Sequence, residues 1–275
     1  MDEIDIVEFL TFKNRLNIMT TSNITFIIGG SSGIGLAVAK QLVTQGINTI
    51  ILGNNINKLE TAKSELTLLS NNKVTVEICQ ANLYKQQDVN SVIAKINTDQ
   101  RHIQYLVNAA GYFNPKPFLA HNLEDYDTYA ALNRATFFIS QAIAKNMIHH
   151  GGGSIVHIGS MWAKQAIKAT PSSAYSMAKA GLHALTQHMA MELAEYNIRV
   201  NAVSPAVVKT PIYKAFIEPA DMDEALTRFN SFHPIGRIGT ADDISNSIIF
   251  LLEDNASWIT GSILDVDGGV MAGRN

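Results

Sequence analysis

The sequence predicts an α/β protein with a doubly wound, parallel sheet. Short runs of β-branched and apolar residues alternate along the chain with longer segments whose apolar residues recur every three or four positions. Glycine-rich or small-residue turns follow several of the predicted strands. Such alternation is typical of a sheet covered by helices on both faces. We therefore expect a three-layer α/β/α sandwich with seven strands in the order 3-2-1-4-5-6-7 and a ligand crevice at their carboxyl ends.

Length and composition agree with one large domain. The chain has 275 residues, of which 47% are hydrophobic, and its net charge is -3. Lysine and arginine form no stripe, so we expect neither a nucleic-acid partner nor a membrane partner. No run approaches the roughly 18 apolar residues of a membrane span. The single cysteine, Cys79, excludes an internal disulfide and is compatible with the cytoplasm.

Residues 1–22 precede the first predicted strand. Their acidic start differs from the basic start of a signal peptide, and no apolar segment of signal length follows. We expect an N-terminal extension that is either loose or packed on the body as a short helix. Residues 23–275 are then predicted to form a single domain.

Each element follows from a local pattern. The helix at 241–252 has Thr240 as its N-cap and acidic residues in its first turn. Residues 206–239 contain no strand pattern and are rich in proline and large apolar side chains, which predicts one or two short helices that form a lid. The predicted strands are 24–28, 49–52, 74–79, 103–107, 154–158, 198–203 and 262–266, and the other predicted helices start near 36 and cover 56–69, 86–97, 122–148 and 172–196.

A glycine-rich loop, Gly29–Gly35, lies between the first strand and the following helix. Gly29 allows a tight turn, Gly33 lets a pyrophosphate approach the backbone, and Gly35 permits close packing of helix and strand. The helix N-terminus faces the anion. Because a strand precedes the loop and a helix follows it, we interpret it as a dinucleotide site rather than as an ordinary turn.

Other strand ends carry small or amide residues at the same rim. The second strand ends in Gly53, Asn54 and Asn55, so neither an acidic residue nor an arginine is present to select between NAD and NADP. Asn82 follows the third strand and can present an amide to an adenine edge. The small residues of 108–111 follow the fourth strand and leave room for a flat ligand.

Tyr175 and Lys179 lie four positions apart on a predicted helix, so the phenol and the ammonium share one side of it. A nearby ammonium favours the phenolate and lowers the tyrosine pKa from about 10. The pair is therefore a candidate acid/base near neutral pH. Asn133 is a poor residue for a helix interior, which marks it as a second functional candidate.

Taken together, these motifs resemble the short-chain dehydrogenase/reductase family from about residue 23 to the C-terminus. The resemblance implies a Rossmann-type fold and an NAD(P)-dependent oxidoreductase that acts on a secondary alcohol or its ketone. The motifs that carry it are the glycine loop at 29–35, Asn108-Ala-Ala-Gly111, Asn133, Ser160, Tyr175-x3-Lys179, Asn201-Ala-Val-Ser-Pro205, Ile259-Thr-Gly261 and Asp267-Gly-Gly269.

The resemblance also implies a role for each catalytic residue, and no metal. Tyr175 is the general acid or base, and Lys179 lowers its pKa and holds the nicotinamide ribose. Ser160 binds the substrate oxygen. Asn133 holds a water that links Lys179 to solvent. The implied cofactor contacts are Gly29, Ser31, Ser32, Gly33, Ile34, Gly35, Asn54, Asn82, Leu83, Asn108, Ala109, Ala110, Gly111, Tyr175, Lys179, Pro205, Thr210 and the backbone of Val208.

Two departures from the family pattern bear on specificity. The segment between Ser160 and Tyr175 is longer than usual, so we expect the loop 161–172 to bulge and reshape the pocket wall. It contains Trp162, a candidate for substrate contact, and two lysines at 164 and 168 that are expected to be solvated. NADP is favoured over NAD because no carboxylate repels a 2′-phosphate and because Ser31, Asn54 and Asn55 can donate to it.

Two other functions stay open, and so does the oligomeric state. A reductase of acyl-carrier-protein-bound 3-oxoacyl groups would need a basic patch, for which Lys209, Lys214, Arg228 and Arg237 are candidates. Sugar, polyol and steroid substrates also stay open. A non-catalytic nucleotide sensor on the same fold is the second alternative. The helices at 122–148 and 172–196 have more than one apolar face, which predicts a homodimer or homotetramer.

Overall fold

The computed structural model describes residues 23–273, so the predictions for residues 1–22 and for the last two residues lie outside the described part. Seven parallel strands form one sheet in the order β3-β2-β1-β4-β5-β6-β7, which confirms the predicted topology. The strands are β1 Ile24–Ile28, β2 Asn48–Gly53, β3 Val76–Gln80, β4 Ile103–Asn108, β5 Gly153–Ile158, β6 Ile198–Pro205 and β7 Ile263–Val266. The α-helices are α2 Gly33–Thr44, α3 Ile56–Leu69, α4 Gln86–Thr98, α5 Leu123–His149, α6 Ser173–Leu193, α7 Met222–Thr227 and α8 Ala241–Leu252.

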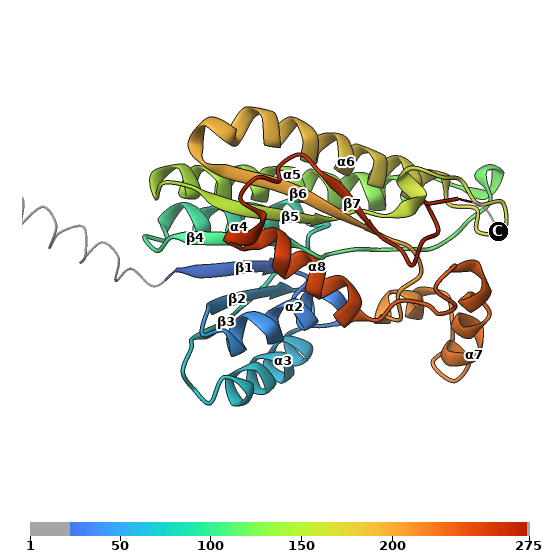
Figure 1. Ribbon diagram of the computed structural model, residues 1–275, viewed down its shortest axis with the longest axis horizontal. Coiled ribbons are helices and arrows are strands. Elements are labelled where there is room, and N and C mark those ends of the chain that lie inside the picture. The colour runs from blue at the N-terminus through green and yellow to red at the C-terminus, as the bar shows by residue number, and fades with distance from the viewer. Residues whose placement is uncertain (1–22, 274–275) are drawn as a thin grey trace, which may run out of the picture.

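Helices cover both faces of the sheet (Figure 1). On one face α5 packs between α4 and α6, and on the other α2 packs between α3 and α8. Successive residues of a strand point to opposite faces. In β1, Phe26 and Ile28 therefore join the apolar cluster under α5, whereas Ile27 joins the cluster under α2. Because both faces are buried, β1 is apolar throughout except for Thr25.

Side-chain caps explain why several helices begin where they do. Asn122 and Asp125 form a reciprocal capping box at the start of α5, and Thr240 and Asp243 form another at α8. Asn55 caps α3, because its side chain accepts a hydrogen bond from the backbone N–H of Lys58. The first turn of each helix is thereby fixed relative to the strand before it.

The structure corrects several predicted boundaries; for example, α2 begins at Gly33 and β6 extends to Pro205. The helix predicted over 172–196 ends at Leu193, and a 3-10 turn over Ala194–Tyr196 follows it. Asn197 then adopts a left-handed conformation with φ of 57°, which reverses the chain into β6. The third strand begins at Val76 rather than at residue 74.

The segment 206–239 contains no strand of the sheet, as predicted. An isolated bridge between Val208 and Gly239 joins its two ends. Between them lie a 3-10 helix over Pro211–Ala215, α7, and a 3-10 helix over Asn230–Phe232. Figure 1 shows α7 beyond the carboxyl ends of the strands. None of the helices between residues 23 and 273 is long and apolar enough to cross a membrane.

Candidate active site

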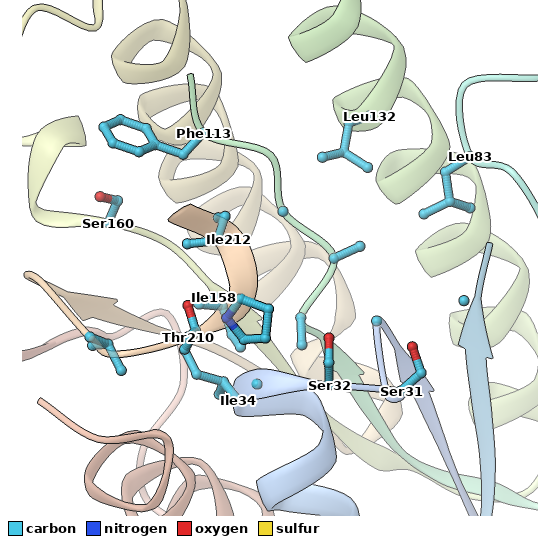
Figure 2. A pocket seen from close by; sticks show the side chains of 18 of the residues that line it. Ser31, Ser32, Ile34, Leu83, Phe113, Leu132, Ile158, Ser160, Thr210 and Ile212 are labelled. Carbon is cyan, nitrogen blue, oxygen red and sulfur yellow. The ribbon is translucent and has the colours of Figure 1, made fainter. Parts of the chain in front are cut away.

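A cavity of about 340 Å³ lies at the carboxyl ends of the strands. Figure 2 shows Ser31 and Ser32 along one side of it, with Phe113 and Ser160 close together at the far end. Catalytic and cofactor candidates from six strand ends therefore share one space. The predicted residues that line it are Gly29, Ser31, Ser32, Gly33, Ile34, Asn54, Asn82, Leu83, Ala109, Ala110, Gly111, Ser160, Tyr175, Lys179, Pro205, Val208 and Thr210.

The glycine loop has the close backbone packing that a dinucleotide site requires. Gly29 has φ of 81°, and a Cβ there would lie 2.7 Å from the backbone nitrogen of Ala110. A Cβ at Gly35 would lie 2.3 Å from the carbonyl oxygen of Gly29, so Gly35 packs beneath the loop and does not line the cavity. Within residues 23–273, the Ser32 side chain makes no capping hydrogen bond to α2. The first N–H groups of α2 are thus available to a phosphate, so these residues fit a nicotinamide dinucleotide.

The end of the cavity beside β2 is lined by Gly53, Asn54 and Lys58. Asn55 does not line it, because this residue caps α3; the expectation that it donates to a 2′-phosphate is not supported by this position. Lys58, in the first turn of α3, belongs to the cavity wall. Asn82 accepts a hydrogen bond from the Tyr84 backbone through its Oδ1, which leaves its amide nitrogen for a ligand.

Ser160, Tyr175 and Lys179 meet at the other end of the cavity. Ser160 follows β5, and α6 carries Tyr175 in its first turn and Lys179 one turn later. Lys179 Nζ donates to the carbonyl oxygen of Ile158 at 2.6 Å and lies 5.8 Å from the centre of the Tyr175 ring. The helical spacing of four residues thus places the ammonium beside the phenol ring.

The electrostatics of this pair differ from the expectation. Burial raises the pKa of Tyr175 to about 12, and the hydrogen bond with Ser160 offsets only part of that rise. Burial also lowers the pKa of Lys179 to about 8. In the protein without cofactor the Tyr175 pKa therefore lies above its ordinary value, because desolvation of the phenolate outweighs the hydrogen bond with Ser160.

Asn133 lies outside the main cavity. Its Nδ2 donates to the carbonyl oxygen of Ala178 at 2.9 Å, which ties α5 to α6. It lines a second cavity of about 20 Å³ together with Tyr175 and Lys179. Asn108 lines this second cavity too and not the main one, since its amide lies 3.3 Å from His157 Nδ1 and 3.4 Å from Ser140 Oγ.

Aromatic side chains enclose the end of the cavity that contains Ser160 and Tyr175, which we call the reactive end. The Phe113 ring meets the Tyr175 ring edge to face, with centres 4.8 Å apart. Its centre also lies 5.9 Å from that of Trp162 and 5.6 Å from that of Phe216. The centre of the Tyr213 ring lies 6.4 Å from the centre of the Phe113 ring. Phe113, which sequence reasoning missed, is therefore the centre of an aromatic wall over Tyr175.

The loop 161–172 contributes one residue to the cavity. Trp162 is 7% exposed and lines it, in a 3-10 turn whose start is capped by the Ser160 hydroxyl. Lys164 forms an ion pair with Asp265 at 2.7 Å, and Lys168 is exposed, so neither lysine lines the site.

His183 is a further residue that sequence reasoning missed. Its Nε2 accepts the backbone N–H of Ser160 at 3.4 Å, and a Cβ on Gly159 would lie 2.1 Å from that nitrogen. Burial lowers the His183 pKa to about 4, so the ring is neutral and can accept. Its position four residues after Lys179, on the same helix side, is a signal that could have revealed it.

The described residues contain no cluster of three or more His, Cys, Asp or Glu side chains able to hold a metal ion. The polar side chains at the end of the cavity opposite β2 are the Ser160 hydroxyl, the Tyr175 phenol and the Lys179 ammonium.

Comparison with other proteins gives matches along nearly the whole chain. A family model described as enoyl-(acyl carrier protein) reductase matches residues 29–271. The 3alpha-hydroxysteroid dehydrogenase of Mediterraneibacter gnavus is 33% identical over 263 residues, which cover 94% of this chain and 98% of that protein. The 3-oxoacyl-[acyl-carrier-protein] reductase of Aquifex aeolicus is 30% identical over 258 residues, with 93% and 100% covered.

One similar solved structure contains a cofactor. L-Sorbose reductase from Gluconobacter frateurii, complexed with NADPH and L-sorbose, has a TM-score of 0.83 at 25% identity, and the match covers 92% of this chain and 97% of that one. The glycine loop, the strand order and these matches lead to one conclusion: the chain belongs to the short-chain dehydrogenase/reductase family and is an NAD(P)-dependent oxidoreductase.

Proposed function

We propose that Tyr175 exchanges a proton with the oxygen of a secondary alcohol or ketone at the end of the cavity where it meets Ser160. The observation that carries this proposal is that both hydroxyl-bearing side chains line the same cavity as the glycine loop. A bound nicotinamide cofactor supplies or accepts the hydride. The protein places the substrate oxygen and moves the proton.

Each catalytic side chain has a separate task in this proposal. Ser160 donates to the substrate oxygen and stabilises the negative charge that develops there. A Tyr175 pKa of about 12 keeps the phenol protonated near neutral pH, which suits it to protonate that oxygen in the reductive direction. The cavity of about 20 Å³ beside Asn133 has space for one water, which would connect Lys179 with the proton supply.

Substitution of Tyr175 tests the mechanism. Tyr175→Phe keeps the ring and its contact with Phe113 but removes the hydroxyl. We expect turnover to be lost while cofactor still binds, because the phosphate end of the cavity is unchanged. Tyr196→Phe, on the 3-10 turn after α6, removes a hydroxyl outside the cavity and serves as the control. Wild-type turnover in Tyr175→Phe would refute the mechanism.

We further propose that the cofactor is NADP. Lys58, Asn54 and Ser31 line the cavity beside β2, and no carboxylate of the described residues lines it. An ammonium there attracts a 2′-phosphate. Lys58→Gln should weaken NADPH binding several-fold and leave NADH binding unchanged, as measured by quenching of intrinsic fluorescence. Lys63→Gln, on the same helix but outside the cavity, is the matched control; tighter binding of NADH than of NADPH by wild type would contradict the assignment.

The two alternative functions have weaker support. Of the basic residues considered for an acidic carrier protein, Lys209, Arg228 and Arg237 are each paired with a carboxylate at 2.6–2.7 Å, which reduces the positive charge of the patch. Activity on a 3-oxoacyl carrier thioester would restore that alternative. A sensor without catalysis would bind NADPH but fail to turn over any carbonyl or alcohol.

We propose that the segment 206–239 acts as a lid and that the chain forms a homodimer or homotetramer through α5 and α6. The lid residues Tyr213 and Phe216 contact Phe113 over the reactive end. Large apolar side chains on the outer faces of α5 and α6 are exposed, including Phe137 and, at 83%, Met191. A monomer in light scattering at micromolar concentration would contradict the assembly.

The single free cysteine supports a cytoplasmic location.

A further inference from the structure

A short segment after β4, residues 112–116, lies between the starts of α5 and α6. It contains no helix or strand, and an isolated bridge joins its Lys116 to Ser172, the N-cap residue of α6. The Lys116 ammonium also forms an ion pair at 2.5 Å with Asp125, in the first turn of α5. Phe113 extends from this segment into the wall of the main cavity at the reactive end (Figure 2). The placement of the segment therefore decides where the Phe113 ring lies.

The Tyr129 hydroxyl binds the residue that follows Phe113. It accepts a hydrogen bond from the backbone N–H of Asn114 at 3.1 Å and donates one to the Asn114 carbonyl oxygen at 3.3 Å. A hydroxyl can do both at once. Tyr129 is 5% exposed, and burial raises its pKa, so the hydroxyl keeps the proton that it donates. One side chain on α5 thus binds both backbone groups of Asn114, as a neighbouring strand would.

The ring of the same side chain contacts Tyr175 directly. The centres of the Tyr129 and Tyr175 rings are 6.0 Å apart, and the rings meet edge to face. Phe113 contacts the Tyr175 ring in the same manner at 4.8 Å. Tyr129 lines the cavity of about 20 Å³ beside Asn133 and not the main cavity, so it is not placed to touch a substrate there. Any effect of Tyr129 on the reaction must therefore act through Tyr175 or Phe113.

We infer that Tyr129 is a positioning residue for the proton transfer: its hydroxyl fixes Asn114 and thereby holds the Phe113 ring against Tyr175. The inference rests on the proposed function, since it concerns the same site. With Phe113 fixed, the Tyr175 ring is restricted to the orientation in which its phenol lies beside Ser160. Without the hydroxyl of Tyr129, the segment 112–116 loses this attachment to α5, and the phenol is less often aligned with the substrate oxygen.

Tyr129→Phe tests the hydroxyl, because it keeps the ring and removes only the oxygen. The rate of NADPH oxidation in single turnovers should fall about fivefold, measured with the ketone that wild type reduces fastest in a panel of cyclic and open-chain ketones. The Kd for NADPH should stay within about twofold, because the glycine loop is unchanged. Tyr126→Phe is the matched control, since Tyr126 lies on the same helix but is 47% exposed, and both of its values should equal those of wild type.

A second substitution shows whether the effect passes through Phe113. Phe113→Leu removes the aromatic ring that the segment 112–116 holds against Tyr175. In this background, adding Tyr129→Phe should change the single-turnover rate less than about twofold, because coupled residues are not additive. The full loss in that background would overturn the inference. Losses of equal size in turnover and in NADPH binding on Tyr129→Phe would also overturn it, because they would indicate a general structural role.

A measurement on wild type decides the case even if a variant fails to fold. The Asn114 N–H should exchange with solvent deuterium at least about tenfold more slowly than in an unstructured peptide, and an unprotected amide would overturn the inference. The two proposals fail separately. A wild-type single-turnover rate in Tyr129→Phe, together with inactive Tyr175→Phe, refutes the positioning role alone. Full activity of Tyr175→Phe refutes the proposed function.

Discussion

Replacing Lys179 by methionine should change how the stability of the cofactor-free protein depends on pH. Burial lowers the Lys179 pKa from 10.5 to about 8, so the folded protein holds this ammonium at a free-energy cost that the unfolded chain does not have. Its hydrogen bond to the carbonyl oxygen of Ile158, at 2.6 Å, offsets part of that cost. Methionine keeps an aliphatic stem in the same place but carries no charge.

The pKa shift sets both the sign and the size of the effect. Between pH 8 and pH 10.5 the unfolded chain binds more protons at Lys179 than the folded protein does, so wild-type stability rises with pH in this window. The full shift corresponds to about 3 kcal/mol, all of it destabilising below the folded pKa. Between about pH 7 and about pH 9.5, wild type should gain about 2 kcal/mol relative to Lys179→Met.

Urea denaturation of the cofactor-free proteins at several pH values measures this difference. Lys168→Met is the control, because it removes an exposed ammonium from the loop 161–172 by the same substitution. Wild type and this control should show parallel stability curves, and only Lys179→Met should diverge from both. Tyr175 is present in all three proteins, so its own titration at higher pH cancels from the comparison.

Parallel curves for wild type and Lys179→Met would refute the reasoning. They would mean that the ammonium is as well solvated in the folded protein as in the unfolded chain. The proton pathway through Lys179 would then need another physical basis.

Two further predictions concern close contacts of the site. Gly35→Ala should weaken NADPH binding by about fivefold or more, measured by fluorescence quenching, because its Cβ would lie 2.3 Å from the Gly29 carbonyl oxygen and overpacking costs about 1–3 kcal/mol. Gly181→Ala is the control, because Gly181 also lies in a helix but a Cβ there would be 3.6 Å from its nearest neighbour atom. This variant should bind NADPH as wild type does. A similar loss of NADPH binding in both variants would mean that alanine disturbs the helices and not the glycine loop. His183→Leu leaves the buried N–H of Ser160 without its acceptor and should reduce stability by about 1–3 kcal/mol in urea denaturation. It should also lower kcat, and wild-type values of both quantities would show that the contact has no role.

Local patterns were sufficient for the architecture. The alternation of apolar periods predicted the strand order, because each strand such as β1 is buried on both faces and each helix on one. The capping residue Thr240 likewise predicted the start of α8. Boundaries were less certain where a single backbone conformation decides them, as at Asn197, since a left-handed residue has no periodic signature.

The positions of the main site residues also followed from sequence. Residues that follow parallel strands must meet at one edge of the sheet, so the loop at 29–35 and Ser160 were placed together without any coordinates. The spacing of four between Tyr175 and Lys179 likewise placed both side chains on one side of α6. These relations depend only on the geometry of strands and helices.

Contacts between distant segments required the tertiary structure. The covering of Tyr175 by Phe113 arises from packing between distant segments, which no local period encodes, and so does the lack of a partner for the Trp162 N–H among residues 23–273. The pKa of Tyr175 also depends on such packing, because desolvation is set by everything that surrounds the ring. Sequence therefore determined the fold and predicted which residues share the cavity, whereas tertiary burial decided the pKa of Tyr175 and of Lys179.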